Sequence, residues 1–162
     1  MKVLSIDPGN TTSGYALMDG YKPIRFGCAD HDYLLGLLET GSLEVDAVII
    51  EMVASYGMSV GKEVFETCVW IGRFWQAAKE YSQVDRVYRL DEKVAICHDS
   101  RAKDTNIRQA LIDRFAKHDF KNGKGTKKKP DFFYGFSKDM WAAFAVGVTW
   151  LDKQKEKEHG TL

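Results

Sequence analysis

The sequence predicts an α/β fold, a mixed β-sheet in which three antiparallel strands are followed by parallel strands, flanked by helices. The opening residues form short apolar runs separated by turn residues, and later apolar runs of strand length alternate with segments of helical periodicity. The length of 162 residues, with 44% hydrophobic and 28% charged residues, is typical of one globular domain. We therefore expect one domain over residues 1–152 and a charged C-terminal tail over residues 153–162.

The first part of the chain predicts three consecutive antiparallel strands. An apolar run over residues 3–7 ends at the turn cluster PGN, and a second strand resumes over residues 13–18. The dipeptide Asp19-Gly20 is a strong hairpin signal, and it leads into a third strand over residues 22–28.

The rest of the chain alternates helices with strands. Helices are predicted where apolar residues recur with the 3.6-residue period, and the continuous apolar run in DAVIIEM predicts a central strand buried on both faces. The expected elements are a helix over residues 30–40, a strand over 45–50, a helix over 60–79, a strand over 84–88, helices over 91–97 and 105–117, a loop over 118–135 and a last helix from residue 137.

Cysteine, histidine and hydropathy patterns exclude several classes of protein. The three cysteines show no CxxC spacing and the four histidines form no HxxxH or HExxH pair, so neither a disulfide framework nor a zinc site is indicated. The longest nearly uninterrupted apolar run has twelve residues, whereas a membrane-spanning helix needs about 20. The chain also passes directly from Met1 into a strand, so we expect a cytoplasmic protein.

The net charge is zero, but the charges are unevenly distributed along the chain. Residues 1–60 hold three basic and eight acidic side chains, whereas residues 86–129 hold thirteen basic and six acidic ones. This asymmetry is compatible with an acidic metal site flanked by a surface that neutralises phosphates. Solvated helix faces explain it equally well.

Three carboxylates stand where a sheet of this kind tends to keep its functional site. Asp7 ends the first strand beside a glycine turn, and Glu51 ends an apolar strand, where an unpaired charge is costly to bury. If these strands are parallel neighbours, both side chains emerge at the same edge. Asp139 begins an apolar helix whose N-terminus should lie close to that edge. Structural roles, as a turn residue for Asp7 and as a helix N-terminal residue for Asp139, are the alternatives.

The three acids together predict a metal site. Hard oxygen ligands without His or Cys favour Mg²⁺ or Mn²⁺ over zinc. Two such ions about 4 Å apart would activate a water for attack on a phosphodiester and stabilise the leaving 3′ oxygen. The sequence therefore predicts two-metal-ion hydrolysis, with Asp7, Glu51 and Asp139 as both metal ligands and catalytic residues.

Three segments carry a resemblance to a known family. They are SIDPGNTTSGYAL at residues 5–17, VIIE at residues 48–51 and SKDMWAAFAVGVTW at residues 137–150. Together they resemble the RuvC family of Holliday junction resolvases, especially its phage-encoded relatives, with Asp7 at the position of the first catalytic Asp and Glu51 at that of the catalytic Glu. The resemblance implies a ribonuclease H-like fold and a homodimer that cuts four-way DNA junctions during recombination and repair, in a bacterial or phage-infected cell.

The last motif departs from the family, which usually has two metal-binding side chains three residues apart on the final helix. Either Asp139 takes the first position and Ala142 the second, or Phe136 takes the first and Asp139 the second. Only one of the two is acidic in either alignment. Asp131 in the preceding loop and Glu66 on the long helix are candidates for a fourth ligand.

Basic and aromatic residues near these motifs are expected to contact DNA. Tyr56 and Met58 stand shortly after Glu51, where the family places a residue that stacks on junction bases. The wide apolar stripe of helix 60–79 is compatible with a dimer contact and with ordinary core. A disordered linker is the alternative for the loop over 118–135. The basic residues expected to contact phosphates are Arg101, Lys103, Lys121, Lys124, Lys127, Lys128, Lys129 and Lys138.

Other classes of protein share some of these features. DPGNTTSG also resembles the phosphate loop of actin-like and sugar-kinase ATPases, but 162 residues cannot readily supply their second lobe. A nuclease of the same fold that processes RNA has the same three acids. A catalytically decayed DNA-binding protein would explain the missing fourth ligand.

Overall fold

The computed structural model describes residues 1–160, which form a five-stranded mixed sheet. Its spatial order is β3-β2-β1-β4-β5, in which the first three strands pair antiparallel and β4 and β5 continue in parallel from β1. This arrangement confirms the predicted mixed sheet. The strands are β1 (Lys2–Pro8), β2 (Thr12–Asp19), β3 (Lys22–Asp30), β4 (Ala47–Met52) and β5 (Gln83–Tyr88).

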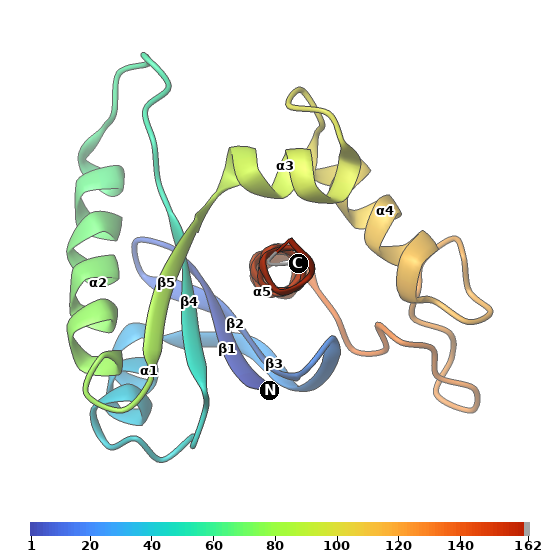
Figure 1. Cartoon of the computed structure of the whole chain (residues 1–162), viewed down its shortest axis with the longest axis horizontal. Helices are drawn as coiled ribbons and strands as arrows, with labels where there is room; N and C mark the ends of the chain where they lie inside the picture. The colour runs from blue at the N-terminus through green and yellow to red at the C-terminus, as the bar shows by residue number, and fades with distance from the viewer. Residues whose placement is uncertain (161–162) are drawn as a thin grey trace.

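Helices cover both faces of the sheet (Figure 1). α1 and α2 lie against one face, α5 crosses the other, and α3 and α4 pack around the outer side of α5. In the part of the chain that the structure describes, no helix is both long and apolar enough to span a membrane. The helices are α1 (His31–Glu39), α2 (Lys62–Ala78), α3 (Arg89–Cys97), α4 (Asp104–Phe115) and α5 (Lys138–His159).

The two central strands are buried on both faces, as the apolar runs predict. Successive side chains of a strand point to opposite faces, so Val3 packs beneath α5 while Leu4 and Ile6 pack beneath α1 and α2. In β4, Ile49 and Ile50 divide between the same two cores. β1 and β4 are therefore packed on both faces, and the residues at their C-terminal ends are held in place by the two cores.

α5 approaches the sheet closely because a glycine faces it. A Cβ atom at Gly147 would lie 2.5 Å from Sδ of Met18 and 3.0 Å from Oγ of Ser5, closer than a methyl group allows. The helix also runs further than expected. Residues 153–159, predicted as part of a charged tail, continue α5 because lysine and glutamate are good helix formers. Residues 161–162 of that tail lie outside the described residues.

The apolar stripe of α2 was predicted in the wrong phase. The sequence predicts a stripe of Val60, Val64, Cys68, Ile71 and Trp75, broadened by Phe65 and Val69. The buried residues of α2 are instead Thr67, Ile71, Phe74 and Ala78, and of the main stripe only Ile71 is buried, while Trp75 packs against the core in part. Phe65 and Val69, which broadened that stripe, are 61% and 62% exposed on the outer face of the helix. Part of the apolar surface of α2 is therefore exposed on the outer side of the molecule.

Candidate active site

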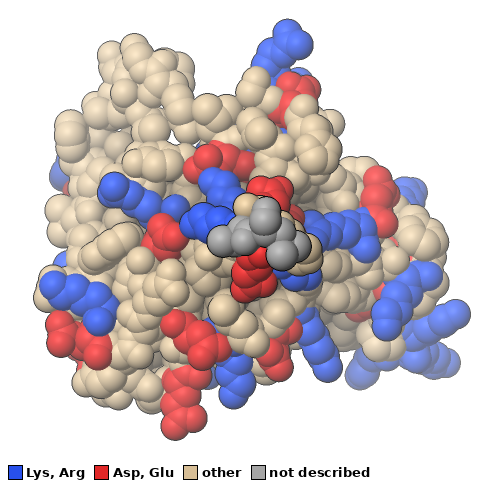
Figure 2. Space-filling view, in the orientation of Figure 1, with Lys and Arg blue, Asp and Glu red and all other residues tan. Residues whose placement is uncertain are grey.

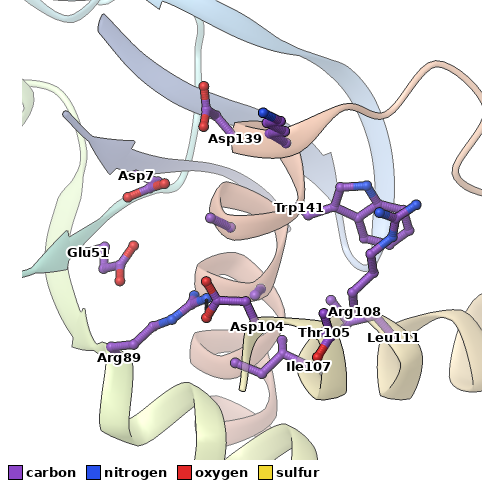
Figure 3. Close-up of a pocket in the computed structure, with 13 residues that line it drawn as sticks. Asp7, Glu51, Arg89, Asp104, Thr105, Ile107, Arg108, Leu111, Asp139 and Trp141 are labelled. Carbon is purple, nitrogen blue, oxygen red and sulfur yellow. Dashed lines mark hydrogen bonds and ion pairs between the residues drawn. The ribbon is translucent and has the colours of Figure 1, made fainter. Parts of the chain in front are cut away.

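Asp7 and Glu51 lie side by side at the ends of the two central strands. β1 and β4 are parallel neighbours whose register pairs Ile6 with Ile50. The next residue of each strand is acidic, so the two carboxyl groups meet at the same edge of the sheet (Figure 3). There, the carboxyl groups of Asp7 and Glu51 lie close enough to affect each other's pKa. Strand pairing alone thus brings together two acids that are far apart in the sequence.

Asp139 reaches the same place from the start of α5. Gly14, which pairs with Asp7 on β2, allows α5 to approach the sheet closely. A Cβ atom at this position would lie only 2.4 Å from the backbone oxygen of Asp139 and 2.9 Å from its Cβ. A side chain at position 14 would therefore force α5 away from the sheet. Figure 3 shows Asp7 between Glu51 and Asp139.

One pocket of about 550 Å³ is lined by all three acids. Arg89, Asp104 and Lys138 also line it, and each is the first residue of a helix, so α3, α4 and α5 all begin at this pocket. Helix N-termini carry partial positive charge and favour anions. The opposite wall is mainly apolar. Its residues include Ile107, Leu111, Trp141, Ala142 and Ala145.

Burial and the charges of neighbouring carboxylates raise the pKa values of Asp7 and Glu51. Burial is the largest cause for Glu51, whose pKa rises to about 10, and the charges of Glu92 and Asp7 add to it. The pKa of Asp7 is raised by burial and then by the nearby charge of Asp139, against the opposing effects of Glu51 and Arg89. The site is therefore short of positive charge, and a divalent cation would offset that deficit.

The donor atoms fit a hard divalent cation. Among the described residues, no three His, Cys, Asp or Glu side chains converge closely enough to form a complete cage for one ion. Mg²⁺ does not need such a cage, because its sites commonly use one or two carboxylates and are completed by water and substrate phosphates. Asp7, with Glu51 on one side and Asp139 on the other, offers such carboxylate pairs.

The structure decides between the two alignments of the last motif. Ala142 lines the pocket one turn after Asp139, whereas Phe136 is 1% exposed and packs against Phe133 and Trp141. These positions favour the alignment in which Ala142, and not Phe136, accompanies Asp139 at the pocket. An alanine stands where a fourth ligand would be expected.

Neither candidate for that fourth ligand lies at the pocket. Glu66 pairs with Lys62 at 3.5 Å on α2, which covers the opposite face of the sheet from α5. The carboxylate of Asp131 is already occupied, since it accepts hydrogen bonds from four backbone N–H groups. Both suggestions were wrong, because sequence position gave no information on which face or loop would hold these residues.

The sequence analysis missed a charged network at the pocket. Arg89 pairs with Glu92 and with Asp104, both at 2.5 Å. Burial works against the charged form of Arg89, but the charges of its two partners raise its pKa above the ordinary value. Burial also raises the pKa of Glu92 to about 8. One signal was available, because Arg89 directly follows β5, a parallel neighbour of β4, and so lies at the strand edge that holds Glu51.

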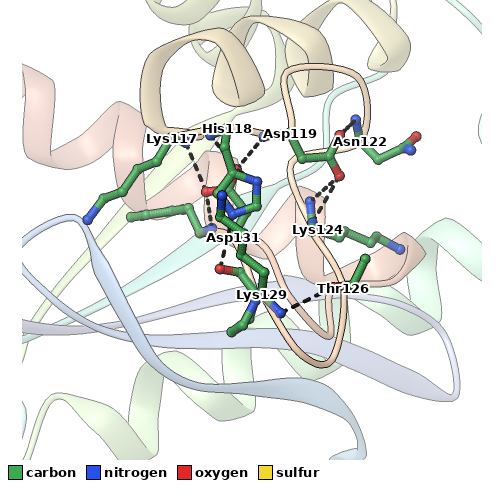
Figure 4. Close-up of polar contacts among 11 residues, drawn as sticks. Lys117, His118, Asp119, Asn122, Lys124, Thr126, Lys129 and Asp131 are labelled. Atoms are coloured by element: carbon green, nitrogen blue, oxygen red, sulfur yellow. Dashed lines mark hydrogen bonds and ion pairs between the residues drawn. The ribbon is translucent and has the colours of Figure 1, made fainter.

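The lysine-rich loop between α4 and α5 is held by two aspartates (Figure 4). Asp131 is buried and accepts the N–H groups of Lys117, His118, Asp119 and Phe132 at 2.7–2.9 Å. Asp119 in turn accepts those of Asn122, Lys124 and Gly125. The loop is thus a fixed structure, and the disordered-linker alternative was wrong.

The basic residues expected to contact DNA lie on the surface. Figure 2 shows Lys and Arg side chains gathered on the side of the molecule that carries the lysine-rich loop in Figure 1. In this loop Lys121, Lys127, Lys128 and Lys129 are exposed and Lys124 is half-buried. Arg101 and Lys103 are exposed on the connection between α3 and α4, and Lys138 lies at the pocket itself.

Tyr56 and Met58 are exposed in the loop between β4 and α2. Their exposed fractions are 57% and 72%, and Tyr56 has a φ of 48°, in the left-handed region that non-glycine residues rarely adopt. Figure 1 shows this loop projecting beyond the body of the molecule. Both side chains are therefore free to contact another molecule.

The mixed sheet and its covering helices form an α/β fold that is similar to the fold of RuvC. A structure of Thermus thermophilus RuvC is 17% identical to the chain, with a TM-score of 0.67 over 99% of this chain and 98% of that one. T. thermophilus RuvC in complex with Holliday junction substrate is 15% identical, with a TM-score of 0.71 over 97% and 96%. No protein-family model and no curated protein sequence matches the chain. The likeness confirms the expected fold.

Proposed function

We propose that the protein is a metal-dependent endonuclease that hydrolyses phosphodiester bonds in branched DNA, with four-way junctions as its substrate. The observation that carries this proposal is the meeting of Asp7, Glu51 and Asp139 in one pocket of a RuvC-like fold. Hard oxygen donors at this edge suit Mg²⁺ or Mn²⁺. One similar structure is that of RuvC in complex with a Holliday junction substrate, which supports the choice of substrate.

Each part of the pocket has a distinct role in this proposal. Asp7, Glu51 and Asp139 would hold two divalent ions, which supply the activation of water and the stabilisation of the leaving oxygen when bound. Gly14 sets the distance between Asp139 and Asp7. The N-termini of α3, α4 and α5 favour the negative charge of the substrate.

The surface around the pocket would bind the arms of the junction. Lys138 at the pocket, together with Arg101 and Lys103, would neutralise phosphates close to the cut. Further away, the DNA backbone would be followed by Lys121, Lys124, Lys127, Lys128 and Lys129 of the lysine-rich loop. Tyr56, on its projecting loop, would stack on bases at the junction centre.

Symmetric cutting of a junction needs two active sites, and we propose a homodimer that uses the outer face of α2. Phe65 and Val69 are both more than half exposed there, and large apolar side chains at adjacent turns are typical of a buried interface. Sedimentation should give a dimer for the wild type and a monomer for Phe65→Asp. A monomeric wild type would contradict this part of the proposal.

A comparison of substrates tests the proposed activity. A four-way junction, a flapped duplex and an RNA:DNA hybrid of matched sequence are incubated with the protein and Mg²⁺ or Mn²⁺. We expect the junction to be cut fastest, in two opposing strands. Preferential cutting of the hybrid would instead support an RNA-processing nuclease. Binding of the junction without cutting of any substrate would support a decayed enzyme, for which the alanine at position 142 is the structural motive.

A further inference from the structure

Arg89 lies where it can contact a substrate in addition to pairing with the nearby carboxylates. It is the first residue of α3, directly after β5, and it lines the pocket together with Asp7 and Glu51. Figure 3 shows its side chain extended across the floor of the pocket towards Asp104. The side chain is 25% exposed and lines the pocket, so part of it remains accessible from solvent.

The two carboxylates that hold Arg89 differ sharply in exposure. The side chain of Glu92 is fully buried, and its second oxygen, Oε1, has no hydrogen-bond partner. Separation of this pair would leave a buried charge uncompensated, so Glu92 is a permanent anchor. Asp104, in contrast, is 81% exposed, and a solvent-exposed ion pair of this kind contributes little to stability. Arg89 can therefore release Asp104 and bind another anion instead.

The groups around the contact between Arg89 and Asp104 would also bind a phosphate in the place of Asp104. A guanidinium presents several N–H donors in one plane and binds carboxylates and phosphates with the same geometry. α3 and α4 both begin at the pocket, and the N-terminus of a helix favours an anion. Thr105, the second residue of α4, adds a hydroxyl group to the lining. An anion bound here would lie beside the acids proposed to hold the metal ions.

We infer that Arg89 binds a backbone phosphate of the DNA at the cleavage site, and that Asp104 occupies the place of this phosphate in the free protein. Glu92 positions the guanidinium throughout. The inference rests on the proposed function, because the phosphate is that of the branched DNA. It adds a subsite that the carboxylates do not provide, and it gives Asp104 the role of a competitor for Arg89.

Binding of a fluorescein-labelled four-way junction, measured in EDTA over a range of salt concentrations, tests the inference without cleavage. The double variant Arg89→Gln/Glu92→Gln replaces the buried ion pair by a neutral pair. It should reduce the slope of log K against log salt by about one and weaken binding about tenfold. Arg89→Lys keeps the charge and should keep the slope, but it should bind several-fold more weakly because it lacks the planar donors.

Asp104→Asn should bind the same junction several-fold more tightly than the wild type, because it removes the competitor. Asp113→Asn is the matched control, since it removes one charge from the exposed side of the same helix, and it should bind as the wild type does. Equal affinity of the two variants, or an unchanged salt slope in the double variant, would overturn the inference. So would a loss of Mn²⁺ binding in Asp104→Asn, which would make Asp104 a metal ligand.

The wild type separates this inference from the proposed function. If the wild-type protein binds no branched DNA, both proposals fail. If it binds the junction and only the Arg89 and Asp104 variants behave unexpectedly, the proposed function stands and the phosphate subsite alone is rejected. Thermal melting followed by circular dichroism checks that each variant is folded.

Discussion

The acidic sheet edge and the lysine-rich loop use the same chemical group in opposite ways. Asp131 in the loop accepts four backbone N–H groups, which lower its pKa well below the ordinary range even though burial acts in the other direction. Glu51 at the sheet edge has no such donors, and burial raises its pKa to about 10. The carboxylate of Asp131 therefore serves to hold the loop, whereas that of Glu51 remains available for a cation. The hydrogen-bond donors around a buried acid thus distinguish a structural role from a functional one.

The largest effect is expected at Asp7. Asp7→Asn should lower the rate of junction cleavage by about 10³-fold or more, because the carboxylate between the other two acids is lost. Single-turnover cleavage of the labelled junction measures this rate. The fold should be unaffected, since the substitution removes a poorly compensated charge. Cleavage at the wild-type rate would show that Asp7 is a turn residue only.

At Asp131 we expect the reverse pattern, a large effect on stability. Asp131→Ala leaves four N–H groups without their acceptor and should lower the free energy of unfolding by about 3 kcal/mol. Urea denaturation measures this loss. Asp113→Ala, at an exposed position on α4, should cost less than about 0.5 kcal/mol. A negligible effect of Asp131→Ala would mean that the loop does not depend on this carboxylate.

Gly14 tests how finely the acidic edge is positioned. Gly14→Ala introduces a Cβ atom 2.4 Å from the backbone oxygen of Asp139, so α5 must shift and carry the carboxylate with it. We expect a decrease in cleavage rate of about tenfold to a hundredfold, with binding of the junction largely retained. Gly36→Ala is a suitable control, because no atom lies within 4 Å of the added Cβ. Equal activity of both variants would contradict the proposed spacing.

The smallest effect is a dependence of stability on pH. Because the pKa of Glu51 is raised on folding, the folded protein binds more protons than the unfolded chain between about pH 4.5 and 10, and the free energy of unfolding falls as the pH rises through this window. Without metal, we expect a loss of about 1 kcal/mol between pH 6 and 8.5 after allowance for solvent screening. Urea denaturation in EDTA at both pH values measures it.

Two changes should weaken this pH dependence. Glu51→Gln eliminates one titrating group, and Mg²⁺ would take the place of its proton, so either should reduce the slope, while Glu92, whose pKa is raised to about 8, retains a part of it. Asp131 contributes in the opposite sense, because its lowered pKa gives stability that is present above about pH 4 and lost only in acid. A stability that rises between pH 6 and 8.5 in EDTA would contradict the account of Glu51.

Much of the fold could be predicted from the sequence because its signals are local. The apolar runs around Leu4 and Ile49 and the Asp19-Gly20 turn determine the strands, and parallel pairing then places Asp7 beside Glu51. The phase of α2 was missed because Phe65 and Val69 are apolar yet exposed, and a hydropathy pattern cannot separate a core face from an outer one.

The charged network and the lysine-rich loop could not be predicted, because both depend on contacts between distant segments. Arg89 and Asp104 are brought together by the packing of α3 against α4. Asp131 looked like a free carboxylate in a polar loop, and only the folded loop shows its four N–H partners. In both cases the residue type was visible in the sequence and its partners were not.

Binding of Mn²⁺, followed by the electron paramagnetic resonance signal of the free ion, reports whether the acids at the sheet edge hold a metal ion. We expect that the wild type removes Mn²⁺ from solution, that Asp7→Asn and Glu51→Gln do so far more weakly, and that Asp119→Asn, in the lysine-rich loop, binds the ion as the wild type does. If the wild type leaves the signal of free Mn²⁺ unchanged, or if Asp7→Asn binds the ion equally well, the acids at the sheet edge are not a metal site.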